Sequence, residues 1–165
     1  MEIVYLETSF ISLLVANSSR DLVTAANQQI TRDWWRFRRE AFVCVASDEV
    51  IREAGQGDPE QARKRLDLLR QLTVLAVTPE AAGLTRALLE TRVLPPRAQT
   101  DAAHLAIAAV AKADYLLTWN CRHLANAQIL GRLEVEAVRL GWKLPRVCTP
   151  LELMGDSAYE TGPDS

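Results

Sequence analysis

Residues 97–119 read "RAQTDAAHLAIAAVAKADYLLTW", and this stretch decides the fold class. Alanine and larger aliphatic residues dominate residues 97–113, as they do in a helix that packs tightly inside a domain. Residues 115–119 then form a short apolar run with the length of a buried strand. A packed helix that leads almost directly into a buried strand is typical of α/β proteins.

The same alternation extends along the chain in both directions. Further strands are expected at residues 3–6, 42–45, 74–77 and 146–149, and further helices at residues 21–40, after Ser47, from Asp58, after Thr78 and at residues 128–140. Strands separated by helices imply right-handed crossovers and a mostly parallel sheet. We therefore predict a three-layer α/β sandwich in a single domain, residues 1–154, followed by a C-terminal tail, residues 155–165, with the composition of a disordered end.

Length, charge and cysteine content narrow the class of protein. A chain of 165 residues suits one domain with a substantial core. The formal net charge of −2 excludes a global positive field, so contact with nucleic acid needs a local basic patch. The amino end lacks the basic segment of a signal peptide, and no apolar run is long enough to span a membrane. Three widely separated cysteines suggest no disulfide framework, so we expect small buried thiols and a cytoplasmic location.

Polar residues mark the ends of two expected strands. Glu7 follows the first strand and Asn120 follows "YLLTW", while Asp101 lies near the start of the preceding helix. Glu53 lies in the helix after Ser47, and Asp48 and Glu49 of the same helix are alternative candidates for its place in the site. Sites in open parallel sheets gather beyond the carboxyl ends of the strands, so these side chains are expected to share one pocket.

Clustered carboxylates repel one another, and a divalent cation such as Mg²⁺ removes that repulsion. Such an ion activates water for attack on a phosphoryl group. Each residue alone has a simpler explanation. Glu7 could be a polar residue where a strand ends at the surface, and Asp101 could be a carboxylate that the helix dipole favours at a helix start. Glu53 could be a solvated helical residue, and Asn120 could be a turn residue.

Three segments together resemble the PIN-domain ribonucleases of the VapC toxin type. They are "VYLETSFISLL", "SDEVIREAGQGD" and "TDAAHLAIAAVAKADYLLTWN", which follow the order and spacing of the motifs of that family over residues 1–150. The resemblance implies a Mg²⁺- or Mn²⁺-dependent endoribonuclease, usually a homodimer that an antitoxin holds inactive. Carried over position by position, the site is Glu7, Glu53, Asp101 and Asn120. Metal-activated water would cleave RNA to leave 5′-phosphate and 3′-hydroxyl ends.

Two positions depart from the pattern of the family. Glu7 stands where an aspartate is usual, and Asn120 replaces the commoner aspartate and removes one negative charge. These departures favour an alternative function, a PIN-fold module that binds RNA or protein with little or no cleavage. A phosphatase with an aspartate nucleophile is a third hypothesis, but "ETS" lacks the DxD spacing that it needs.

Residues around the expected site are candidates for contacting RNA. They are Thr8, Ser9, Arg122 and His123, although His123 serves equally well as a structural histidine. His104, on an apolar helix, is expected in the core or in an interface. In "TRDWWRFRRE", residues 31–40, arginines lie beside two tryptophans. Exposed aromatics there would stack on bases, but we favour an amphipathic helix with its tryptophans in the core or under an antitoxin segment.

Overall fold

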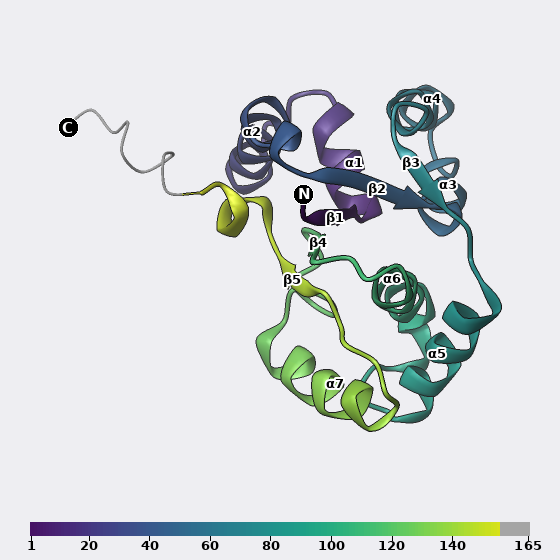
Figure 1. Cartoon of the computed structure of the whole chain (residues 1–165). Coiled ribbons are helices and arrows are strands. Elements are labelled where there is room, and N and C mark those ends of the chain that lie inside the picture. Colours follow the sequence, from purple (N-terminus) through teal and green to yellow (C-terminus); the bar gives the residue numbers. More distant parts are fainter. Residues whose placement is uncertain (156–165) are drawn as a thin grey trace.

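Five parallel strands form one sheet at the centre of the computed structural model, of which residues 1–155 are described (Figure 1). The strands are β1 (Ile3–Leu6), β2 (Val43–Ser47), β3 (Thr73–Leu75), β4 (Tyr115–Leu117) and β5 (Arg146–Cys148). Their order across the sheet is β3-β2-β1-β4-β5, and every neighbouring pair is parallel. The predicted α/β class with a mostly parallel sheet is confirmed.

Seven α-helices in the described residues cover the sheet. They are α1 (Thr8–Val15), α2 (Leu22–Phe37), α3 (Asp48–Ala54), α4 (Pro59–Leu69), α5 (Pro79–Glu90), α6 (Gln99–Val110) and α7 (Ala127–Arg139), with short 3-10 helices at Arg39–Ala41, Pro96–Ala98 and Pro150–Leu153. Figure 1 shows α1, α2 and α4 over one face of the sheet and α5, α6 and α7 across the other. The predicted three layers are therefore present. None of these helices is long and apolar enough to span a bilayer.

The core is densest around β1, β4 and α6. Val4, Tyr5 and Leu6 of β1 are fully buried, as are Leu116 and Leu117 of β4. Most residues of α6 are also buried, and their small alanine side chains let the helix lie close to the sheet. This close packing brings polar residues of α6 to the ends of the central strands.

The helix α1 was not expected from the sequence. It begins directly after β1, and its N-cap is Glu7, whose carboxylate accepts a hydrogen bond from the backbone N–H of Ser9. Serine, threonine, aspartate and asparagine are the usual N-cap residues, so a glutamate gives no clear signal for a helix start. The strands and the other α-helices lie where they were predicted, with ends that differ by a few residues.

Burial corrects or confirms further expectations. Cys148 is buried and Cys44 is partly buried, but Cys121 is exposed, so it is not the buried thiol that was expected. Trp34 is fully buried and stacks on Phe42 with ring centroids 5.7 Å apart, as the core interpretation of residues 31–40 predicts. The predicted tail, residues 155–165, lies outside the described residues except for Gly155.

Candidate metal centre

The polar residues lie at the carboxyl edge of the sheet, where β1 and β4 are neighbours. In the sheet, β2 lies on one side of β1 and β4 lies on the other, so the strand order reverses at β1. Crevices at such a reversal of strand order are the usual place for sites in open α/β sheets. Glu7 follows β1 directly, and Thr118 and Asn120 follow β4. The fold therefore places them together.

Glu7, Glu53 and His104 form what we call the acid–histidine cluster. One ligand atom from each lies within 4.8 Å of the others. His104 Nε2 is 2.6 Å from Glu53 Oε1 and 3.8 Å from Glu7 Oε1. His104 is fully buried, Glu7 is 5% exposed and Glu53 is partly exposed, so the cluster opens toward solvent beside Glu53.

Hydroxyl and backbone groups hold the carboxylate of Glu7. Its Oε2 accepts hydrogen bonds from the backbone N–H of Ser9, from the Ser9 hydroxyl, and from Thr118 Oγ1 at 2.8 Å. Oε1 is the oxygen that faces His104. The Thr8 hydroxyl donates to Glu53 Oε1 at 2.7 Å. Thr8 and Ser9, candidates for contacting RNA, thus orient carboxylates here, and contact with RNA stays a prediction.

A second group of side chains contains Asp101, Asn120 and His123, and we call it the Asp101 group. Asn120 Nδ2 donates to Asp101 Oδ1 at 3.0 Å, and His123 Nδ1 lies 3.0 Å from Asp101 Oδ2. Thr118 joins this group to the acid–histidine cluster, because its hydroxyl also accepts the backbone N–H of Asn120 at 2.9 Å. Arg122 lies exposed in the same loop.

Burial and the interaction between His104 and Glu53 shift the pKa of each residue in opposite directions. Burial raises the pKa of Glu53, but hydrogen bonds from His104 and Thr8 outweigh it and hold that pKa below its usual value. Burial lowers the pKa of His104, but its hydrogen bond to Glu53 and the charges of Glu7 and Glu53 raise it above the usual value. The shifts agree that the charged forms of the two partners stabilise each other.

This chain is similar to solved structures that include the following two. A structure of VapBC2 from Rickettsia felis, bound to a DNA fragment from their promoter, aligns with a TM-score of 0.54 and 17% identity, covering 73% of this chain and 90% of that one. Mycobacterium tuberculosis VapC20, a sarcin-ricin loop cleaving toxin, aligns with a TM-score of 0.54 and 16% identity, covering 72% and 91%. The chain has the PIN-type fold of VapC toxins. No family model and no curated protein matches the sequence.

Within this VapC-type fold, the rival acids of α3 occupy different environments. Glu49 pairs with Arg52 at 2.6 Å, and Asp48 is exposed. Glu53 alone of the three contacts His104. Its position one turn further along α3 turns its carboxylate toward α6, so Glu53 is the acid that we retain for the site.

His104 is the residue whose part in the site the sequence analysis missed. It is in the core as expected, but its Nε2 also contacts Glu53. The available signal was its position three residues after Asp101, which places both side chains on the same face of a helix. Two carboxylates and an imidazole are donors that fit a divalent cation.

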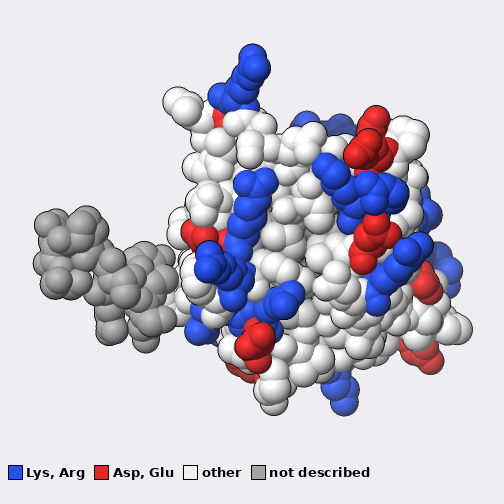
Figure 2. Space-filling model, turned by 90° about the horizontal axis from the view of Figure 1, so that it is seen from above, with Lys and Arg blue, Asp and Glu red and all other residues white. Residues whose placement is uncertain are grey.

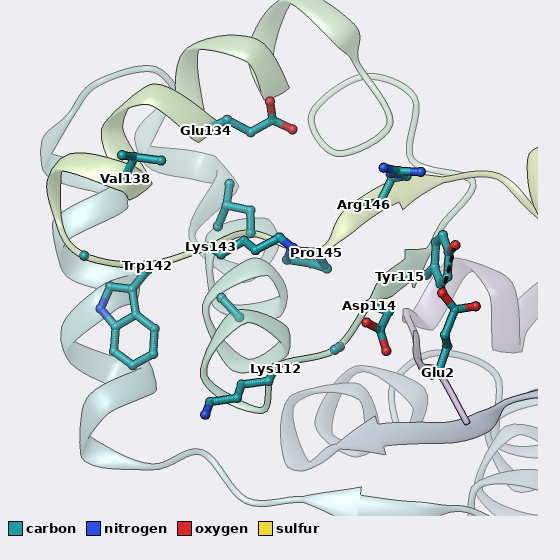
Figure 3. A pocket seen from close by; sticks show the side chains of 14 residues that line it. Glu2, Lys112, Asp114, Tyr115, Glu134, Val138, Trp142, Lys143, Pro145 and Arg146 are labelled. Carbon is teal, nitrogen blue, oxygen red and sulfur yellow. Dashed lines mark hydrogen bonds between the residues drawn. The ribbon is translucent and has the colours of Figure 1, made fainter.

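A separate cavity lies at the opposite edge of the sheet. It has a volume of about 930 Å³ and is lined by the amino ends of β4 and β5, the end of α6, and α7. Figure 3 shows Glu134 and Val138 of α7 on one side and Glu2, Asp114 and Tyr115 on the other. No residue of the acid–histidine cluster lines it. The carboxyl edge, where Glu7, Glu53 and His104 form a group that could hold a metal ion, is the better candidate.

Proposed function

We propose that the chain is a metal-dependent endoribonuclease and the toxin of a toxin–antitoxin pair. The observation that carries the proposal is the convergence of Glu7, Glu53 and His104 at the β1/β4 edge of a VapC-type fold. A bound divalent cation, Mg²⁺ or Mn²⁺, would polarise the scissile phosphate and lower the pKa of water. VapC20, described as a sarcin-ricin loop cleaving toxin, supports RNA as the substrate class.

In this proposal some residues would bind the metal ion, and others would orient its ligands or contact the RNA. Glu7 and Glu53 supply carboxylate oxygens, and Asp101 adds a third carboxylate from the first turn of α6. Asn120 holds the Asp101 carboxylate through its amide N–H. Arg122, which is exposed in the same loop as Asn120, would contact a phosphate of the RNA backbone.

An antitoxin and a second copy of the chain are the protein partners in this proposal. VapBC2, the similar complex from Rickettsia felis, supports the antitoxin. Exposed apolar side chains at the start of α2, Leu22 and Val23, offer surface for a protein partner. Three free cysteines suit a cytoplasmic location. Light scattering of the purified chain, alone and with its antitoxin, would measure both assemblies.

The test is cleavage of RNA by the purified chain with Mg²⁺ or Mn²⁺. Asp101→Asn should abolish metal-dependent cleavage, because a carboxylate is lost while the hydrogen bonds of the side chain are largely kept. Asp48→Asn is the matched control, since it makes the same change at an exposed position on α3 and should leave cleavage unchanged. Products with 5′-phosphate and 3′-hydroxyl ends are expected. Undiminished cleavage by Asp101→Asn would overturn the assignment.

A binding module without turnover is the second candidate function. The orientation of Asn120 favours it, because the side-chain carbonyl oxygen accepts backbone N–H groups of Arg122 and His123 and so adds no oxygen ligand to the site. The same assay separates the two functions. RNA binding that survives Asp101→Asn, with no cleavage by the wild-type chain in either metal, would support the module.

A further inference from the structure

The acid–histidine cluster has the dimensions of a single coordination shell. In an octahedral shell with bonds of about 2.1 Å, neighbouring ligand atoms lie about 3 Å apart and opposite ones about 4.2 Å apart. The atoms of the cluster lie within 4.8 Å of one another, and Glu7 Oε1 is 3.8 Å from His104 Nε2. The 2.6 Å contact between Glu53 and His104 must lengthen slightly to fit such a shell. An imidazole nitrogen is therefore placed as a ligand would be.

A hydrogen bond at Nδ1, the ring nitrogen other than Nε2, fixes the ring of His104, as in many metal sites. Its Nδ1 lies 2.7 Å from the hydroxyl of Tyr5, which lies 2.7 Å from Ser47 Oγ. All three side chains are fully buried. Metal-binding histidines commonly have the second ring nitrogen held by such a partner, which sets the tautomer and the orientation of the ring. Binding of a metal ion through Nε2 would require Nε2 to lose its proton, with the remaining ring proton on Nδ1 donated to the Tyr5 hydroxyl, because ligating groups must generally be deprotonated.

Asn120 presents hydrogen-bond donors to the site rather than an oxygen. Its Oδ1 accepts the backbone N–H groups of Arg122 and His123, at 3.2 and 3.1 Å, and its Nδ2 points to Asp101. The fourth position of the expected acidic set thus contributes no lone pair to a cation. Nε2 of His104, once deprotonated, is the remaining candidate donor beside Glu7 and Glu53.

We propose that His104 is a metal ligand, so that this mixed carboxylate–imidazole centre binds a first-row transition-metal dication such as Mn²⁺ more tightly than Mg²⁺. This inference rests on the proposed function. Mg²⁺ favours oxygen ligands and keeps several of its waters, whereas imidazole favours transition metals. A site with one buried nitrogen among its few protein ligands discriminates between these ions.

Pulsed electron paramagnetic resonance of the Mn²⁺-loaded wild-type chain tests the ligand directly. Coupling between Mn²⁺ and a ¹⁴N nucleus is expected, and incorporation of ¹⁵N-histidine should convert it to ¹⁵N coupling. The chain has two histidines, so two variants assign the signal. His104→Gln should lose the coupling, and His123→Gln, the matched control beside Asp101, should keep it. The labelling experiment uses wild-type protein and does not depend on the folding of a variant.

Calorimetric titration with Mn²⁺ and with Mg²⁺ tests the selectivity. Mn²⁺ should bind the wild type more tightly than Mg²⁺, and His104→Gln should weaken Mn²⁺ binding by about tenfold or more, with a smaller loss for Mg²⁺. Mn²⁺ binding without nitrogen coupling, coupling that disappears only in His123→Gln, or equal affinities would overturn this inference while RNA cleavage persists. Absence of binding by both ions would overturn the proposed function as well.

Discussion

Thr118 is a buried residue that connects the acid–histidine cluster to the Asp101 group. Its hydroxyl donates to Glu7 Oε2 and accepts the backbone N–H of Asn120. In a sequence, a threonine at the end of a strand is explained by the preference of β-branched residues for strands. Here its hydroxyl fixes both the carboxylate that follows β1 and the loop that follows β4, so the geometry of the site depends on it.

Thr118→Val should disturb the site while it preserves the shape of the side chain. One of the donors to Glu7 is lost and the Asn120 N–H loses its partner, which should cost about 1–3 kcal/mol of unfolding free energy. Binding of Mn²⁺ should weaken about 10–100-fold, as for other residues that orient metal ligands. Urea unfolding and calorimetry measure the two effects.

The matched control is Thr85→Val on α5. Thr85 is also buried, and its hydroxyl donates to the carbonyl of Ala81 within the same helix, away from the cluster. Binding of Mn²⁺ should be unchanged in this variant. Equal losses of Mn²⁺ affinity in the two variants would show that Thr118 has no special part in the site.

The three cysteines should differ in reactivity. Burial raises the pKa of the Cys44 thiol to about 11 and that of Cys148 to about 12, so neither forms appreciable thiolate near pH 8. Cys121 is exposed. Ellman's reagent at pH 8 should therefore label one thiol rapidly in the native chain and all three in denaturant. Cys121→Ser should remove the rapid phase, and a rapid phase that persists would contradict this assignment.

At the scale of elements, Trp34 packs α2 against several neighbouring segments. The indole stacks on Phe42, packs edge-on against Phe10 at 5.5 Å, and donates to the carbonyl of Leu153 at 3.1 Å. It thus joins α2 to α1 and to the 3-10 helix at Pro150–Leu153. Its neighbour Trp35 is only partly buried and lies under the guanidinium of Arg39.

Trp34→Ala should destabilise the fold by about 3–5 kcal/mol, because it removes a large buried side chain and leaves a cavity. Trp35→Ala, the control on the same helix, should cost clearly less. Thermal and urea unfolding measure both. If Trp34→Ala instead left stability unchanged and weakened only RNA binding, residues 31–40 would be an RNA surface and not a packed helix.

The elements also show what the sequence predicts and what it leaves out. Apolar runs and caps such as Ser47 and Thr78 are local signals, so they predict most strands and helices. The sequence does not predict the helix α1, because a glutamate caps it. It does not predict the contacts of His104 either, because the partners Glu53 and Tyr5 are 51 and 99 residues away in the chain. Family motifs supply Glu7, Glu53 and Asp101, but the orientation of Asn120 emerges only in the folded chain.

At the scale of the whole molecule, acidic and basic residues nearly balance in number. The formal net charge is −2. Figure 2 shows basic and acidic side chains interspersed on the face that it presents, with uncharged surface between them. For example, Arg63 on α4 and Arg70 just after it both pair with Asp67. The contacts that the proposed nuclease makes with phosphates should therefore be few and confined to the site, with Arg122 among them.

A shallow salt dependence of RNA binding follows from this distribution. Each phosphate contact to single-stranded RNA contributes a slope of about −0.7 to a plot of log K against log salt concentration, so about two contacts predict a slope between about −1 and −2. Binding is measured with the Asp101→Asn chain, which should leave the RNA uncut. Arg122→Ala on that background should make the slope shallower by about 0.7. Arg70→Ala should leave it unchanged, because Arg70 follows α4 just before β3 begins, at the opposite edge of the sheet from the site. A slope steeper than about −4 would require about six contacts, and RNA would then cross an extended basic surface, contrary to this expectation.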